Sequence, residues 1–386
     1  MGYKTKPSPA MIVRAELKTF FYPLAVMCNT IIGVGIFGLP YVAAKVGLPL
    51  MFGYFLVIGA LIAVIHLMFC EVALKTPDYK RLGGFARIYL GKWGAAVAIV
   101  SNIIGFFGIM VAFMIVGGQF LYEFASPLLG GDQAAYSFLY FLAGALLIYF
   151  GINIVSRVGL WGLAMFFAIF AILAFKGMPF FTSQNLAAHT GAAGDFLLPY
   201  GAVLFALWAS SSIPEVEEML GRKNRKDLLK PVMIAASLIA LVTYFLFVVM
   251  IVGITGPSTT QSAFIGLKQV LGNGAMSLFF LFGVVTSFTS FIIVGLTLKK
   301  ILVYDVRIEK HVAWALTAIV PIILFLSGFK NFIDIFSLVG GVLLGLDGIL
   351  IILMYQKIRP ARKLATYPLL LIFVGGIIYE LAYYLK

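Results

Sequence analysis

Long runs of apolar residues, separated by short polar stretches, dominate the chain. A helix that crosses the hydrocarbon core of a bilayer needs about 20 such residues. The runs predict eleven membrane-spanning helices, near residues 19–45, 48–74, 93–124, 135–152, 157–178, 195–220, 228–254, 275–302, 312–328, 332–355 and 366–385. The longest connections between them are too short to hold a soluble domain. We therefore expect an all-α integral membrane protein with a single transmembrane domain over residues 1–386.

The basic residues lie mainly in alternate connections. They cluster near residues 4–18, 75–92, 157, 222–230, 299–310 and 357–363, whereas the opposite side holds only Lys45, Lys176, Lys268, Lys330 and Lys386. Cytoplasmic loops carry an excess of Lys and Arg. This pattern predicts a cytoplasmic N-terminus and a C-terminus outside, in the plasma or inner membrane of a cell. It also accounts for the net charge of +13 without a nucleic-acid partner.

Composition supports the bilayer as the solvent and argues against an enzyme. Hydrophobic residues make up 62% of the chain and charged residues 11%, far from the balance of a soluble domain. The two cysteines lie inside apolar runs, where they form no metal-ligand spacing. The histidines, His66, His189 and His311, lie on separate segments, and no metalloprotease or nucleophile motif occurs. We expect no catalytic site, no cofactor beyond a coupling ion, and no obligate protein partner.

Two of the predicted helices contain residues that disfavour a regular helix. The first has Gly33, Gly35 and Gly38 at mid-membrane, followed by Pro40, and the sixth has three serines followed by Pro214. Each Gly costs about 1 kcal/mol and each Pro about 3 kcal/mol relative to Ala inside a helix. Non-helical backbone within a membrane is tolerated where it lines a cavity. Both helices are therefore expected to be broken.

The two breaks occupy matching places in the chain. The sixth helix starts five helices after the first, so it enters the membrane from the opposite side. This predicts two inverted halves, helices one to five over 19–178 and helices six to ten over 195–355, with an eleventh helix at 366–385. Interrupted helices in matching positions of two halves indicate the binding site of a transporter.

Two stretches carry a family resemblance. NTIIGVGIFGLPYVAAKVGL (29–48) resembles the first helix of the amino acid–polyamine–organocation superfamily, which has the LeuT-type fold. LPYGAVLFALWASSSIPEVEEML (198–220) resembles helix six of its amino acid/auxin and hydroxy/aromatic amino acid permease branches. TSFIIVGLTL (289–298) is similar to helix eight of the same branches.

The resemblance implies a site for a substrate amino acid. The amides of Gly33, Val34 and Gly35 would hold its carboxylate, whereas Val34 replaces a serine that is common among relatives. Backbone carbonyls near the second break would hold its amine, and an aromatic ring and a serine would lie beside it. These positions are Ala206, Leu207, Trp208, Ser210 and Ser211.

The coupling ion has two candidates. In sodium-coupled relatives a cation lies between helices one and eight, and the matching positions are Asn29, Ile32, Thr289 and Ser290. Thr286 and Ser287, one turn earlier, are a competing pair of hydroxyls. For protons, His66 is a titratable group inside a membrane helix, and an imidazole that is merely packed between helices is the alternative. Glu215 follows the second break, where it could reach the inner vestibule or act as a gate.

Three further acids lie within predicted helices. Glu71 is expected to pair with the basic inner loops, whereas Asp347 and Glu380 have no assigned role, and each is a candidate to carry a proton.

We therefore expect a secondary transporter of a neutral, large or aromatic amino acid, which works by alternating access with Na⁺ or H⁺. The alternatives are an amino-acid exchanger or a membrane nutrient sensor on the same fold. Its partners would be the amino acid and the lipid bilayer. The breaks contain no charged residue, which favours a neutral side chain. Phe106, Phe107, Phe288 and Phe291 are candidates to line an apolar pocket.

Overall fold

The computed structural model describes residues 9–151, 155–187, 191, 193–222, 224–329 and 331–384. The predictions for His189, Lys330 and Lys386 fall outside these ranges. The described part is helical and contains no strand. Its α-helices are α1 Pro9–Ile31, α2 Gly35–Val46, α3 Leu48–Lys75, α4 Leu82–Leu129, α5 Gln133–Phe150, α6 Val155–Gly177, α7 Ser183–Ala187, α8 Leu198–Leu207, α9 Ile213–Gly221, α10 Leu229–Thr255, α11 Ala263–Leu271, α12 Asn273–Tyr304, α13 Lys310–Leu326, α14 Phe332–Leu338, α15 Gly345–Ile358 and α16 Lys363–Tyr384.

The spans agree with the hydropathy pattern. In the described part, 8 helical stretches are long and apolar enough to cross a membrane, and α1 with α2 forms one further span that is bent by 50°. Two shorter apolar helices, Ala164–Phe180 and Lys310–Leu326, match the fifth and ninth predicted spans. The fold class is therefore confirmed: an all-α, multi-pass membrane protein with a broken first helix. The limits of the two halves, 19–178 and 195–355, stay a prediction.

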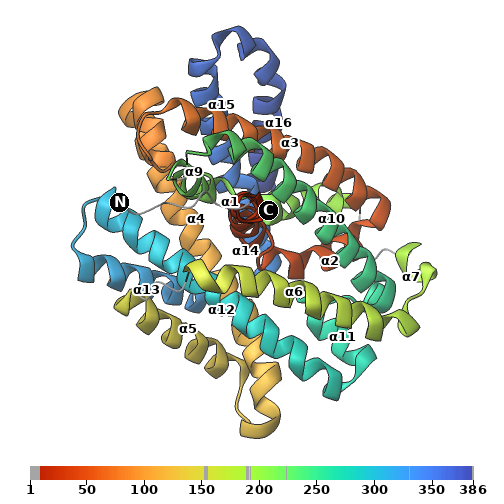
Figure 1. The fold of residues 1–386 in the computed structure, drawn as a ribbon. Coiled ribbons are helices and arrows are strands. Elements are labelled where there is room, and N and C mark those ends of the chain that lie inside the picture. The colour runs from red at the N-terminus through yellow and green to blue at the C-terminus, as the bar shows by residue number, and fades with distance from the viewer. Residues whose placement is uncertain are drawn as a thin grey trace.

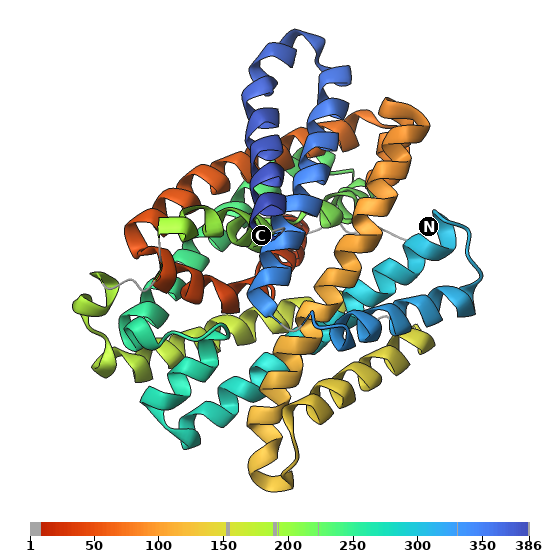
Figure 2. The ribbon, with the colours of Figure 1, turned by 180° about the vertical axis from the view of Figure 1, so that it is seen from behind.

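The broken helices lie at the centre of the molecule (Figure 1). α1 is surrounded by the other helices, while α15 and α16 form a hairpin at the top of both views (Figure 2). α4 crosses the whole molecule and packs against α5 and α12. Its first part, Leu82–Leu90, is set off by Gly91, where φ is 78° and the helix bends.

Two features differ from the sequence-based expectation. The connections 179–194 and 255–274 contain the short helices α7 and α11. The tenth span is interrupted by a π-helical segment, Val339–Leu344, between α14 and α15. Apolar residues fill this segment as they would an ordinary helix, so the hydropathy pattern does not reveal it. Single π-helical turns within α-helices frequently occur at functional sites.

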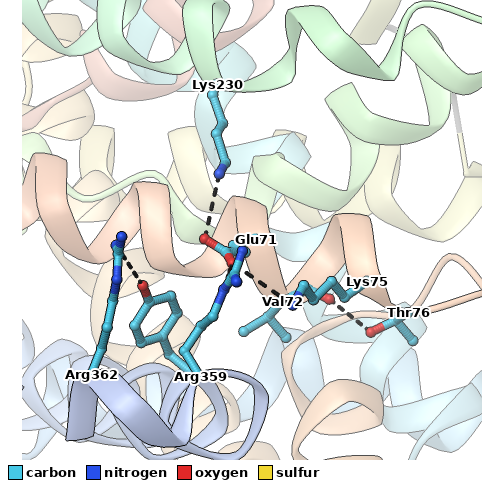
Figure 3. A network of polar contacts seen from close by, with 8 residues as sticks. Glu71, Val72, Lys75, Thr76, Lys230, Arg359 and Arg362 are labelled. Atoms are coloured by element: carbon cyan, nitrogen blue, oxygen red, sulfur yellow. Dashed lines mark hydrogen bonds and ion pairs between the residues drawn. The ribbon is translucent and has the colours of Figure 1, made fainter.

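A polar network joins three spans at one end of the helices (Figure 3). Glu71 of α3 accepts a hydrogen bond from Lys230 of α10 at 3.4 Å and another from Arg359, at the end of α15. Lys75 lies 4.0 Å from the same carboxylate. The expectation that Glu71 pairs with basic loop residues is therefore confirmed. Its position also places the ends of α3, α10 and α15 close together.

Candidate functional site

The first break interrupts the span formed by α1 and α2. α1 ends at Ile31, and α2 begins at Gly35. The Gly33 amide donates to the Ile31 carbonyl at 2.8 Å, whereas the amides of Val34 and Gly35 have no hydrogen bond with another described residue. Gly38 and Pro40 lie inside α2, so the break is shorter than the glycine pattern suggests. The start of α2 thus presents two free N–H groups and the positive end of its dipole.

The second break separates α8 from α9. Trp208 and Ala209 are non-helical, and Ser210–Ser212 form a 3₁₀ turn. The Cβ of a side chain at Gly35 would lie 2.9 Å from Ala206 Cα, so the start of α2 touches the end of α8. The positive end of one half-helix therefore meets the negative end of the other. The Ser212 hydroxyl donates to Thr30 Oγ1 at 3.0 Å and links the two breaks directly.

Tyr244 of α10 connects the carbonyl ends of both broken helices. Its hydroxyl lies 3.1 Å from the Ala206 carbonyl and also within hydrogen-bonding distance of the Ile31 carbonyl. The residue is fully buried. One hydroxyl therefore contacts a carbonyl at each helix break: that of Ala206, and that of Ile31, which also accepts the Gly33 amide. Sequence reasoning missed this residue, because nothing distinguishes it among 18 tyrosines.

His66 of α3 supports the second break from behind. Its Nε2 accepts a hydrogen bond from the Ala209 amide at 3.2 Å, and its ring lies 5.6 Å from that of Trp208. The side chain is fully buried, and Nδ1 has no hydrogen-bond partner in the described part of the chain. An imidazole that accepts through Nε2 carries its proton on Nδ1. This hydrogen bond is what a neutral imidazole packed between helices would make, which was the alternative to a proton-coupling role for His66. His66 also does not line the cavity described next.

A cavity of about 350 Å³ lies between the breaks and the helices α4, α12 and α15. Of the predicted substrate positions, Gly33, Val34, Gly35, Ala206, Trp208 and Ser211 line it. Leu207 is outside the lining, and Ser210 lines a smaller neighbouring cleft. Much of the remaining surface is apolar: Val26, Phe106, Ile109, Phe113, Phe205, Ile293 and Val294. Of the four phenylalanines proposed for an apolar pocket, only Phe106 lines this cavity, and Phe288 and Phe291 pack against Tyr140.

The structure brings together two of the four predicted sodium ligands. Asn29 and Ser290 line the cavity, whereas Ile32 and Thr289 do not. The Thr289 hydroxyl donates to the Val285 carbonyl at 2.8 Å, one turn earlier in α12. Hydroxyls in membrane helices often bond in this way. The sodium site stays a prediction.

One end of the cavity is polar and continues into the smaller cleft. Glu215 and Lys300 are both exposed and line the cavity there. The cleft shares Glu215 and adds Arg81 and Asp305. Burial raises the pKa of the Asp305 carboxyl, and nearby Arg81 opposes this shift. Glu215 thus lies at the mouth, where the sequence predicted a vestibule or gate residue.

The opposite end is closed by aromatic side chains. The lining of α4 stops at Phe113, and about two turns further Phe120 packs with Phe37 of α2 and Phe264 of α11. The rings of Phe37 and Phe264 are 4.9 Å apart. Beyond this cluster, Lys268 of α11 lies 2.5 Å from Glu123 of α4. The cavity is therefore open at one end of the bundle and closed at the other.

Two polar residues that the sequence did not assign also line the cavity. Asp347 of α15 is 4% exposed, and Asn102 of α4 contacts its carboxylate. Both lie within membrane spans, where a polar or ionisable residue by itself indicates a candidate functional position. Glu380, the other unassigned acid, is buried in α16 outside this lining.

Comparison with known proteins agrees with this architecture. MhsT in complex with L-phenylalanine superimposes with a TM-score of 0.70 at 14% identity and covers 93% of this chain and 98% of its own. Mhp1, a nucleobase-cation-symport-1 family transporter with bromovinylhydantoin bound, gives a TM-score of 0.67 at 13% identity, with 94% and 90% covered. At these identities the likeness concerns the fold.

Sequence comparison is more specific. The tyrosine-specific transport system 1 of Haemophilus influenzae is 24% identical over 195 residues. The aligned segment covers 50% of this chain and 48% of that relative, so the match spans about half of each. The model of the tryptophan/tyrosine permease family matches residues 17–380, nearly the full length. The chain is thus a membrane transporter rather than an enzyme, and it belongs to the tryptophan/tyrosine permease family.

Proposed function

We propose that this transporter moves a neutral amino acid with a large or aromatic side chain across the membrane by alternating access. The observation that carries the proposal is the pair of helix breaks at one cavity, with the free amides of Val34 and Gly35 beside the carbonyl end of α8. A zwitterion needs hydrogen-bond donors for its carboxylate and acceptors for its ammonium group. Opposed half-helix ends supply both.

In the proposed complex the carboxylate binds the amides of Val34 and Gly35. The Gly33 amide is already bonded to Ile31, so it contributes less than the sequence suggests. The ammonium group binds the Ala206 carbonyl at the end of α8, with Ser211 beyond it, whereas Leu207 and Ser210 lie outside the cavity lining. Tyr244 holds the Ala206 carbonyl in place for this contact.

The substrate side chain extends into the apolar part of the cavity. Phe106, Ile109 and Phe113 of α4 face Phe205 of α8 and Trp208 across this space. A large apolar ring gains most from such surroundings. The names of two relatives, one tyrosine-specific and one bound to L-phenylalanine, support the same substrate class.

Uptake is proposed to draw on a cation gradient. The basic connections assign the Arg81 end of the bundle to the cytoplasm, so the open mouth with Glu215 faces inward. The N-terminus is then cytoplasmic and the C-terminus outside. Sodium would use the predicted set around Asn29 and Ser290, and a proton would need a titratable group at the cavity.

Reconstituted protein tests the proposal. Proteoliposomes preloaded with unlabelled L-tyrosine are expected to take up labelled L-tyrosine by counterflow, with competition from tryptophan and phenylalanine but not from lysine or aspartate. Imposed sodium or pH gradients then distinguish coupled uptake from pure exchange. Saturable binding without any flux would favour a sensor. The absence of both binding and flux for every aromatic amino acid would refute the proposal.

A further inference from the structure

Asp347 is a buried acid that faces the cavity. It lies in the first turn of α15, directly after the π-helical segment, and 4% of its surface is exposed. It lines the same cavity as Val34 and Trp208. An ionised carboxylate inside a membrane span is costly and is usually paired or functional. The residues around Asp347 therefore indicate whether its carboxylate is merely paired or has a function.

The carboxylate has no positive partner in the part of the chain that the structure describes. None of the ion pairs within 4.0 Å among these residues involves Asp347. Asn102 Nδ2 lies 3.3 Å from both of its oxygens, and the Ser101 hydroxyl also interacts with the carboxylate. The charged residues that line the cavity are Lys300 and Glu215, both exposed at the mouth.

The helices packed against α15 bring no closer titratable partner. α4 presents Ser101 and Asn102. The buried titratable groups of α3 and α16 are His66, Cys70 and Glu380, and none of them lines the cavity or bonds to Asp347. Asp347 is thus isolated from other charges except through the cavity itself.

The neighbouring polar groups suit a proton better than a metal cation. Asn102 Nδ2 also donates to the Ala98 carbonyl at 2.8 Å, which fixes the amide so that its NH₂ group faces the carboxylate. The Ser101 hydroxyl is bonded to the Leu343 carbonyl at 3.0 Å. Hard cations need several oxygen ligands, whereas the side chains that contact Asp347 are the NH₂ group of Asn102, which cannot bind a cation, and one hydroxyl, that of Ser101. A proton needs only the carboxylate and water in the cavity.

Asp347 is also linked mechanically to the substrate helices. The π-helical segment before it packs on α8: the Cβ of a side chain at Gly340 would lie 2.0 Å from the Gly201 carbonyl. A change in the charge of Asp347 therefore acts on a segment in direct backbone contact with α8, whose end forms part of the site.

We propose that Asp347 is the coupling-proton site of this transporter. A carboxylate oxygen takes a proton from water when the cavity faces outside, and the neutral acid crosses with the substrate. The acid returns the proton to cavity water at the cytoplasmic mouth, and Asn102 stabilises the carboxylate that remains. This inference rests on the proposed amino-acid transport and names its coupling ion.

The test compares Asp347→Asn with wild type in proteoliposomes that contain a pH-sensitive dye. Two assays are run on each protein: L-tyrosine counterflow without a gradient, and accumulation driven by an inside-alkaline gradient. The variant is expected to retain counterflow within a few fold of wild type and to lose both accumulation and the substrate-dependent proton signal. Glu380→Gln, which alters a buried acid outside the cavity, is the matched control and should keep both.

Accumulation by Asp347→Asn at the wild-type level would overturn the inference, as would wild-type uptake that follows sodium and carries no proton signal. Absence of wild-type counterflow would instead refute the proposed function, so the two failures are distinguishable. If Asp347→Asn does not fold, Asn102→Leu provides the second test. Loss of its N–H donor should shift the pH dependence of counterflow to higher pH, and an unchanged profile would contradict the role of Asp347.

Discussion

Tyr244→Phe removes one hydroxyl and leaves the ring that fills the space. In the folded protein that hydroxyl is the shared donor for the carbonyls of Ile31 and Ala206, at the ends of α1 and α8. A buried polar group left without its partner costs roughly 1–3 kcal/mol. The two carbonyls lie beside the proposed ammonium site. We therefore expect much of this free-energy cost to appear as weaker substrate binding.

This free-energy cost of roughly 1–3 kcal/mol corresponds to a loss of affinity for L-tyrosine. Since about 1.4 kcal/mol corresponds to a factor of ten, L-tyrosine should bind about 5- to 150-fold more weakly. Equilibrium binding to purified protein measures the change directly. Tyr200→Phe is the control, because this tyrosine of α8 is also buried, whereas its hydroxyl has no hydrogen-bond partner among the residues that the structure describes.

The two variants together test whether the Tyr244 hydroxyl organises the substrate site. The reasoning requires that Tyr244→Phe loses affinity while Tyr200→Phe binds as wild type does. Equal affinities for all three proteins would show that the hydroxyl of Tyr244 does not organise the site, and equal losses in both variants would show a general effect of removing buried hydroxyls.

Three further predictions address the surroundings of the cavity. Gly33→Leu should abolish L-tyrosine binding without loss of folding, because a Cβ at Gly33 meets only carbonyl oxygens 3.8 and 4.0 Å away; retained binding by a folded Leu variant would contradict the site. Gly35→Ala should instead lower stability by about 1–3 kcal/mol in thermal unfolding, since its Cβ would lie 2.9 Å from Ala206 Cα; a wild-type melting temperature would exclude this contact. His66→Leu should cost about 1–3 kcal/mol by leaving the Ala209 amide without an acceptor, and His66→Gln should recover part of it; full stability of the Leu variant would argue against the hydrogen bond.

The glycines show which features of the site the sequence predicts and which it does not. The Gly-rich stretch of the first span and the three serines of the sixth predict both helix breaks, because residues that disfavour a helix leave a visible pattern. The same stretch does not reveal which glycine faces the cavity. Gly38 serves packing, since its Cβ would lie 2.9 Å from a ring carbon of Phe332, a residue almost 300 positions away.

The polar partners of the site depend on contacts between distant segments. His66 to Ala209, Tyr244 to Ala206 and Asn102 to Asp347 each join separate spans. An ionisable residue within a membrane helix can be recognised from the sequence as a candidate functional residue, as for His66 and Asp347. The partner follows only from the three-dimensional packing. The sequence likewise does not reveal that the Thr289 hydroxyl donates to the Val285 carbonyl of its own helix.

The central claim is that the cavity between the two helix breaks binds an aromatic amino acid, and equilibrium binding of labelled L-tyrosine to the purified protein tests it most directly. Each of the other amino acids is added as a competitor, and Gly33→Leu serves as the variant with a filled cavity. The account predicts saturable binding that tryptophan and phenylalanine displace, that lysine and aspartate do not, and that Gly33→Leu lacks. Binding that is absent for every aromatic amino acid, or that persists unchanged in a folded Gly33→Leu protein, would contradict it.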